Sequence, residues 1–413
     1  MSPLSPLHLL RYGAANVATP LLATAAGWIA YSRLAIDHEV PLPPALAAEH
    51  EHFSSVAGKL GYYRDRSASG RPLVLIHSIN AAASAYEMRP LFEHFRGSRP
   101  VFALDLPGFG TSDRSDRDYA PTLYRDAIID FLTAKVGAPA DVIALSLGCE
   151  FTALAANLRP EAFHSLTLIS PTGLSGEERG GNTPRARRLH SAFSVSLWRQ
   201  AFYDLLASRP SLKYFLRRSH AGDVDPGLLN YAFLTSHQKD AVHAPLCFIS
   251  GRLFTPAIAE STYVRLSRPT LVIYDQDAFI SFDRLPEIMS RNEQWRAIRI
   301  VPTRGLPHWE RLPETVAALE AFWAGSAATS QAADPSDAEG EADAAAEEAA
   351  DPAADPAADS QGEAEDTAEE AADPAADPPD AAGDPTAETA GDSELEPSAE
   401  GDAADEPAPE NDG

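Results

Sequence analysis

The chain has 413 residues and a formal net charge of −27. The acidity is concentrated at one end: residues 331–413 hold 29 Asp and Glu and no Lys or Arg, whereas residues 1–330 hold 33 basic and 31 acidic residues. A nearly neutral body offers no basic footprint, so the composition excludes nucleic acid as a partner.

Residues 12–32, between Arg11 and Arg33, contain no charged side chain. The stretch is as long as a membrane span, but it includes Asn16, Pro20 and many alanines, which contribute little to insertion. Three interpretations stay open: a helix that packs on the body or lies on a membrane surface, a membrane span, or a signal peptide cleaved near residues 23–25. The protein is therefore expected in the cytoplasm or in contact with a membrane through residues 12–32, with secretion as the alternative.

After a proline-rich connection, short apolar runs alternate with helical patterns. Strands are predicted at residues 55–63 (an edge hairpin strand), 72–77, 100–105, 141–145, 165–170, 270–274 and 295–301. Helices are predicted at residues 84–95, 122–136, 148–158, from 284, and at 313–323. This alternation predicts an α/β fold with a mostly parallel, doubly wound sheet.

The alternation stops between residues 172 and 264, apart from a short apolar run at residues 246–249. A structureless loop of this length is rare, so we expect an inserted helical cap. The cap contains the aromatic residues Trp198, Phe202, Tyr203, Tyr214, Phe215, Tyr231 and Phe233. At helical spacing these are more often packing residues than pocket lining, and any that face a cleft would make that part of the substrate site apolar.

These patterns divide the chain into five parts. They are an N-terminal apolar helix and linker (1–40), a first core segment (41–171), the cap (172–264), a second core segment (265–326) and an acidic tail (327–413). The tail lacks aromatic residues and repeats Asp-Pro-Ala-Ala, so we predict that it is disordered. The sequence does not identify a partner for it.

Cys149 and Cys247 are too few for a disulfide framework and are predicted to be small buried residues. No metal-ligand spacing and no phosphate-binding loop is found, and Gly108-Phe109-Gly110 lacks the third glycine of a dinucleotide loop. No cofactor and no metal are expected.

Ser146 lies between the strand at 141–145 and the helix at 148–158, in the run Ala144-Leu145-Ser146-Leu147-Gly148. A serine there occupies a tight turn that exposes its hydroxyl and directs the N–H groups of the helix toward the group it attacks. Ala144 and Gly148 are the small residues that this turn requires two positions before and after the serine. The pattern predicts a nucleophile elbow, with alanine where glycine is usual.

Residues 53–323 resemble the α/β-hydrolase superfamily. The resemblance rests on His77 at a strand end, the loop at residues 105–113, the Ser146 elbow, and the segments 274–277 and 305–310. The superfamily's order of nucleophile, acid and histidine implies a triad of Ser146, Asp277 and His308. Imidazole can take the serine proton near neutral pH, and a carboxylate orients the imidazole.

Two positions of this triad have rivals. Asp275 competes with Asp277, which we favour because Asp275 lies nearer the strand end; either carboxylate can instead cap a helix. In many relatives the histidine follows a glycine at a fixed distance before a Glu, and counting back from Glu310 gives Gly305. Either the loop is rebuilt so that His308 reaches Ser146, which we expect, or the base has been lost.

The resemblance also implies an oxyanion hole made by two backbone N–H groups. Leu147 would supply one, and Ser78 or Ile79, in the loop after His77, the other. Asn80 is a candidate for an additional side-chain amide, and His77 is expected to fix the loop rather than act as a base.

Function follows from the resemblance as an expectation: a cofactor-independent serine hydrolase that acts on an apolar ester or related acyl small molecule through an acyl-enzyme. A serine nucleophile argues against dehalogenase and epoxide hydrolase chemistry, and leaves esterase, lipase, C–C hydrolase and acyltransferase activities open. Two other classes stay open, a catalytically silent binding protein with this fold and a membrane-tethered interaction protein.

Overall fold

The computed structural model describes residues 22–176 and 180–331, all of which belong to one compact unit, residues 1–342. A second unit, residues 343–413, lies outside the described residues. The predictions for residues 12–21, and for the acidic tail beyond residue 331, therefore fall outside the described part of the chain.

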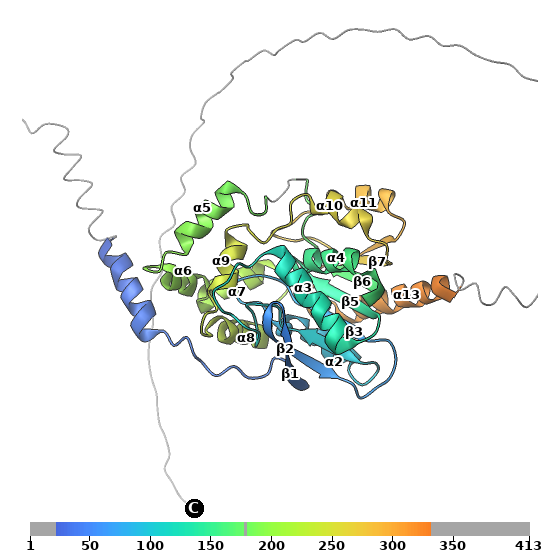
Figure 1. The fold of residues 1–413 in the computed structure, drawn as a ribbon, viewed down its shortest axis with the longest axis horizontal. Helices are drawn as coiled ribbons and strands as arrows, with labels where there is room; N and C mark the ends of the chain where they lie inside the picture. Colours follow the sequence, from blue (N-terminus) through green and yellow to red (C-terminus); the bar gives the residue numbers. More distant parts are fainter. Residues whose placement is uncertain (1–21, 177–179, 332–413) are drawn as a thin grey trace, which may run out of the picture. The chain divides into compact units, whose positions relative to one another are not determined.

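The described residues form an eight-stranded sheet with helices on both faces (Figure 1). The strands are β1 (Glu49–Ser55), β2 (Gly58–Asp65), β3 (Leu73–Ile76), β4 (Val101–Leu104), β5 (Ala140–Leu145), β6 (Phe163–Ile169), β7 (Thr270–Tyr274) and β8 (Trp295–Arg299). Their order is β1-β2-β4-β3-β5-β6-β7-β8, and β2 runs antiparallel to both its neighbours, β1 and β4. All pairs from β4 through β8 are parallel, which confirms the predicted mostly parallel sheet.

Alternate strand residues supply two separate apolar cores, as the two-residue period of a strand requires. Val142 and Ala144 of β5 join the core that includes Phe151, whereas Ile143 and Leu145 join the core that includes Phe92. The first core is covered by α3 (Pro121–Phe131), α4 (Gly148–Leu158) and α11 (Leu285–Arg291), and the second by α2 (Arg89–Phe95) and α13 (Leu312–Gln331). Short turns η1 (Ala85–Met88), η2 (Leu132–Val136) and η3 (Pro160–Ala162) precede or follow these helices.

A helical insertion separates β6 from β7, in the segment predicted as a cap. It contains α5 (Pro184–Phe193), α6 (Arg199–Leu206), α7 (Arg209–Arg218), α8 (Pro226–Ser236), α9 (His243–Ile249), α10 (Ile258–Ser261) and η4 (Tyr263–Arg265). The apolar run at residues 246–249, which resembled a short strand, lies in α9; Leu246 packs there against buried Tyr203 and Val242. Periodicity cannot separate a short buried helix from a short buried strand.

The loop after β4 is held by a buried carboxylate. Asp105 is fully buried and accepts the N–H of Ala85 at 2.8 Å and both the N–H and the hydroxyl of Thr111 at 2.9 Å. The two glycines of this loop, Gly108 and Gly110, therefore belong to a turn that Asp105 holds closed.

Residues 22–35 form a helix, blue in Figure 1, that lies beside the insertion. Trp28 donates to the carbonyl oxygen of Ala201 at 2.7 Å, and Ser32 donates to Asp204 at 2.6 Å. This part of the N-terminal segment packs on the body. No helix among the described residues is long and apolar enough to cross a bilayer.

Candidate active site

Ser146 occupies the sharp turn between β5 and α4. Its φ is +53°, a conformation that non-glycine residues adopt at a cost, and its side chain is half-buried. The turn is held because the Ser146 N–H donates to the carbonyl of Ile169 at 2.9 Å and its own carbonyl accepts the N–H of Cys149 at 3.0 Å. The strand, turn and helix predicted around this serine are all present.

Gly148 allows the first turn of α4 to pack closely against the backbone at the end of β3. A Cβ on this residue would lie 2.4 Å from the carbonyl oxygen of His77, closer than any real side chain approaches backbone. The small residue predicted two positions after the serine is therefore required by the approach of α4 to the end of β3.

Two of the predicted oxyanion donors remain free of acceptors. Among the described residues, the N–H groups of Leu147 and Ile79 have no recorded hydrogen-bond acceptor. The Ser78 N–H, in contrast, donates to Oε2 of Glu87 at 2.9 Å. Ser78 is therefore not the second donor, and Ile79 is the candidate that the structure leaves.

Glu87, which the sequence did not single out, organises the loop after β3. Its Oε1 accepts the Asn80 side-chain amide at 2.7 Å, and the Asn80 oxygen accepts the Ala82 N–H at 2.7 Å. The Asn80 amide also donates to the Ser78 hydroxyl at 2.9 Å, so it is engaged within the loop rather than directed at a substrate. The predicted helix at residues 84–95 also contains Arg89, Glu93 and His94, so the sequence carried no signal that singled out Glu87.

Both ring nitrogens of His77 are used by backbone groups. Nε2 accepts the N–H of Leu106 at 2.9 Å, and Nδ1 donates to the carbonyl of Ser78 at 2.6 Å. Burial lowers the pKa of His77, although Glu87 and Asp105 oppose that effect. The ring thus connects the loop after β3 to the loop after β4.

The two candidate acids have different surroundings. Asp275 is buried and paired with Arg299 at 2.8 Å, and it also accepts the N–H of Thr303 at 2.9 Å. Asp277 accepts the N–H of Phe279 at 2.7 Å, and its Oδ2 lies 2.7 Å from the point where a Cβ on Gly305 would stand. Both carboxylate oxygens of Asp275 hold Arg299 and the loop after β8. Asp277 is therefore the better candidate for the acid of the triad.

His308 is not positioned as the predicted base. Its ring is fully buried in α12 (Pro307–Glu310), and Nε2 lies 2.9 Å from the carbonyl oxygen of Glu87. Nδ1 is buried without a partner among the described residues, so neither nitrogen is bonded to Ser146 or Asp277. Burial lowers the pKa of His308 to about 4, which the hydrogen bond to Glu87 only partly opposes. The expected rebuilding of the loop toward Ser146 is not seen, and a Cβ on Gly305 would lie 2.7 Å from Oδ2 of Asp277.

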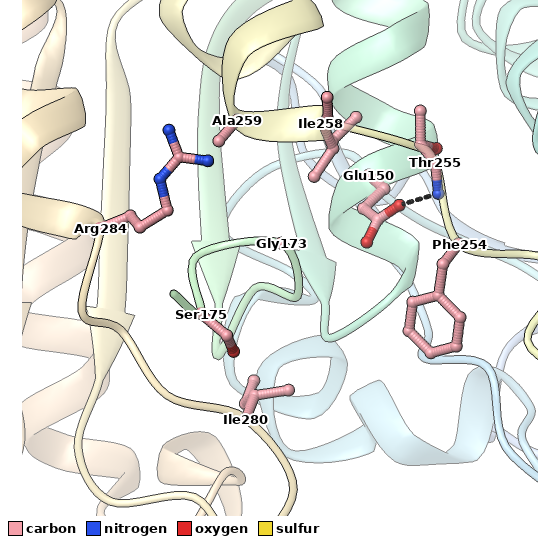
Figure 2. A pocket seen from close by; sticks show the side chains of 10 residues that line it. Glu150, Gly173, Ser175, Phe254, Thr255, Ile258, Ala259, Ile280 and Arg284 are labelled. Atoms are coloured by element: carbon pink, nitrogen blue, oxygen red, sulfur yellow. Dashed lines mark hydrogen bonds between the residues drawn. The ribbon is translucent and has the colours of Figure 1, made fainter. Parts of the chain in front are cut away.

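A small cavity of about 20 Å³ lies beside α4 (Figure 2). Its lining includes Glu150, Gly173 and Ile280. Glu150, four residues after Ser146, is buried and accepts the N–H of Thr255 at 2.7 Å and the hydroxyl of Thr172. The cavity has room for about one water molecule, and none of the predicted triad residues lines it.

The helical insertion contacts the loop after β3 and the loop after β4. Tyr203 of α6 donates to the carbonyl of Ala81 at 2.8 Å, and Arg114 donates to the Thr235 hydroxyl of α8 at 2.9 Å. Of the predicted aromatic residues, Tyr203 and Tyr231 are buried, whereas Trp198, Tyr214 and Phe215 are exposed. The buried members pack the insertion, and the exposed ones face outward.

Comparisons with known proteins agree with this architecture. The profile of the alpha/beta hydrolase family matches residues 73–319, more than half of the chain. No curated protein matches the sequence.

Solved structures of the same fold are similar at low identity. A serine hydrolase involved in carbazole degradation is 15% identical, with a TM-score of 0.54, over 67% of this chain and 99% of that one. A thermophilic esterase from Thermogutta terrifontis is 17% identical (TM-score 0.53; 68% and 99% covered), and an alpha/beta hydrolase fold protein from Burkholderia ambifaria 18% identical (TM-score 0.52; 68% and 98% covered). At such identities the likeness concerns the fold, and the family match carries the assignment: this chain belongs to the alpha/beta hydrolase family.

Proposed function

We propose that the protein is a cofactor-independent serine hydrolase that acts on a small carboxylic ester or related acyl compound, with Ser146 as its nucleophile. The observation that carries the proposal is the turn at Ser146, held at φ +53° between β5 and α4. A strained conformation of this kind persists only where the surrounding structure fixes it. Membership of the alpha/beta hydrolase family supports hydrolase chemistry at this serine.

In the proposed reaction, Oγ of Ser146 attacks the carbonyl carbon and the carbonyl electrons move onto oxygen. The N–H groups of Leu147 and Ile79 would hold that oxyanion, which is why their lack of other acceptors matters. The bond to the leaving alcohol then breaks to give an acyl-enzyme, and water releases the acid.

Among the described residues, the site lacks a good acceptor for the proton that Ser146 must lose. His308 keeps a lone pair at Nδ1 while Nε2 donates to Glu87, but an imidazole with a pKa near 4 is a poor acceptor at neutral pH. We therefore propose that a water molecule takes the serine proton and that the leaving alcohol regains it, so that acylation is slow and favours esters with good leaving groups.

The test is hydrolysis of p-nitrophenyl acetate and butyrate by the full chain. We expect slow turnover without a burst of p-nitrophenol, because acylation limits the rate, and loss of activity by about 10²-fold or more in Ser146→Ala. Ser191→Ala, an exposed serine in α5, is the matched control and should retain activity. Equal rates for wild type and Ser146→Ala would refute the proposal.

A second candidate is a binding protein that holds an acyl ligand without turning it over. It is favoured by the position of His308, whose Nε2 lies 2.9 Å from the carbonyl oxygen of Glu87 and whose ring is not bonded to Ser146 among the described residues. Its test is to incubate the folded protein with a bound ester and recover the ligand. An intact ester after prolonged binding supports this candidate, and release of the acid excludes it.

A further inference from the structure

The first half of the helical insertion is strongly basic. Residues 184–218 contain eight Lys and Arg but a single acid, Asp204. That acid is buried and bonded to Ser32 and His38, so it does not screen the surface. In the described part of the chain, only Arg199 of these eight cations is paired with a carboxylate, that of Asp116 at 3.4 Å.

The same region exposes most of the large apolar side chains found on the surface. Sixteen such residues are exposed in the described chain, and ten of them lie in residues 22–35 or 184–218. They are Leu22, Tyr31, Leu34, Leu189, Val195, Leu197, Trp198, Leu205, Tyr214 and Phe215. Because isolated exposed apolar residues are normal but concentrated ones mark contact surfaces, this distribution calls for a partner.

Hydrogen bonds hold the two segments together. Arg33 donates to the carbonyl oxygens of Ser196 at 3.0 Å and Leu197 at 2.9 Å, and Trp28 donates to Ala201. Figure 1 shows the helix of residues 22–35 next to α6. The described part of the uncharged N-terminal stretch, residues 22–32, therefore packs on the body at this basic and apolar region.

This surface extends along α7 to the loop of the candidate acid. The ring of Phe215 lies 6.3 Å from that of Phe279, and the guanidinium of Arg218 lies over Phe279 at 5.2 Å. Phe279 is two residues after Asp277. We define the basic apolar face as residues 22–35 and 184–218 together with Phe279.

We propose that the basic apolar face binds the surface of a bilayer that contains anionic phospholipid. The eight cations complement lipid phosphates, and interspersed Leu, Trp, Tyr and Phe side chains suit the boundary between headgroups and acyl chains. The apolar residues are distributed over four helices and the link between α5 and α6, rather than gathered in a groove for one peptide. Continuity with an uncharged N-terminal stretch further favours a lipid surface over an acidic protein.

The experiment is co-sedimentation of the full chain with phosphatidylcholine vesicles, with or without phosphatidylglycerol, at low and physiological salt. We expect binding only with phosphatidylglycerol and weakening by salt. Arg185→Gln/Arg188→Gln/Arg217→Gln and Leu197→Ser/Trp198→Ser should each reduce partitioning by about tenfold or more. Circular dichroism of every variant checks that it is folded.

Matched controls remove equal charge or apolar surface elsewhere. Arg71→Gln/Arg159→Gln/Arg296→Gln and Val56→Ser/Leu158→Ser change exposed residues outside the basic apolar face and should bind like wild type. Three results would overturn the proposal: no vesicle binding, equal binding to pure phosphatidylcholine, or equal losses in face and control variants. Binding to soluble polyglutamate but not to vesicles would assign the face to an acidic protein instead.

Discussion

The ring of His308 is hydrogen-bonded to the main chain of Glu87, with Nε2 at 2.9 Å from the carbonyl oxygen. The indole nitrogen of Trp309 donates to the same oxygen at 2.7 Å, while the Glu87 carboxylate accepts the Ser78 N–H. One residue therefore holds both the loop after β3 and the helix that carries His308. The histidine expected to serve Ser146 is used to hold these two segments together.

Replacing Glu87 should disturb the loop after β3. Glu87→Ala removes the acceptor of the buried Ser78 N–H and one acceptor of the Asn80 amide, which should cost about 1–3 kcal/mol of unfolding free energy. Glu87→Gln keeps one acceptor oxygen and should lose less. Urea unfolding measures both, and equal stability of wild type and Glu87→Ala would show that these bonds contribute nothing.

Gly148→Ala should strain the start of α4, because the new Cβ would lie 2.4 Å from the His77 carbonyl oxygen. We expect a loss of about 1–3 kcal/mol, together with slower reaction of Ser146, since backbone must move. Gly27→Ala is the control, as no atom lies within 4 Å of the Cβ position there. A fully stable and reactive Gly148→Ala protein would contradict the close approach.

Gly305→His tests whether the residue facing Asp277 can serve as the base. The left-handed φ of +97° strains any side chain, so Gly305→Ala is the matched variant that shares this strain. We expect both to be less stable than wild type by about 1 kcal/mol. Faster ester hydrolysis by Gly305→His than by Gly305→Ala is the expected outcome, and equal rates would show that an imidazole at this position does not reach Ser146.

The buried His308 should make stability depend on pH. Its pKa is about 4 in the folded chain and about 6.5 when unfolded, so the unfolded chain binds the extra proton between these values. The free energy of unfolding is therefore highest above pH 6.5. It falls by on the order of 3 kcal/mol as the pH drops toward 4. His308→Gln should flatten this dependence in urea unfolding at pH 7 and pH 4.5, whereas exposed His94→Gln should not. An unchanged slope in His308→Gln would place the ring in water rather than in the core.

The sequence predicted the sheet and the serine turn because both depend on local patterns. The buried runs that became β3 to β8 were bounded by turns and helices, and Ser146 stood between Ala144 and Gly148. The antiparallel hairpin of β1 and β2 was anticipated only in its second strand. Its first strand, Glu49–Ser55, alternates His and Glu and carries almost no apolar signal.

The remainder of the site depends on contacts between distant segments. Residue order placed His308 after Asp277, but order cannot show that the ring is directed at Glu87, 221 positions away. For the same reason, the hydrogen bond from the Ser78 N–H to the Glu87 carboxylate could not be predicted from the sequence. The choice of Asp277 over Asp275 rested on distance from a strand end, whereas the structure distinguishes them through the ion pair of Asp275 with Arg299.

The most direct measurement of the central claim, that Ser146 is a reactive nucleophile, is labelling of the full chain by a fluorophosphonate, followed by mass spectrometry. The serine oxygen attacks the phosphorus of this probe and fluoride leaves. The reaction therefore tests the serine and its oxyanion donors without requiring an alcohol to leave. The account predicts a single adduct on Ser146, absent from Ser146→Ala and from heat-unfolded protein. A folded chain that remains unlabelled at Ser146 after prolonged exposure would contradict it and would leave the binding protein as the function that fits the site.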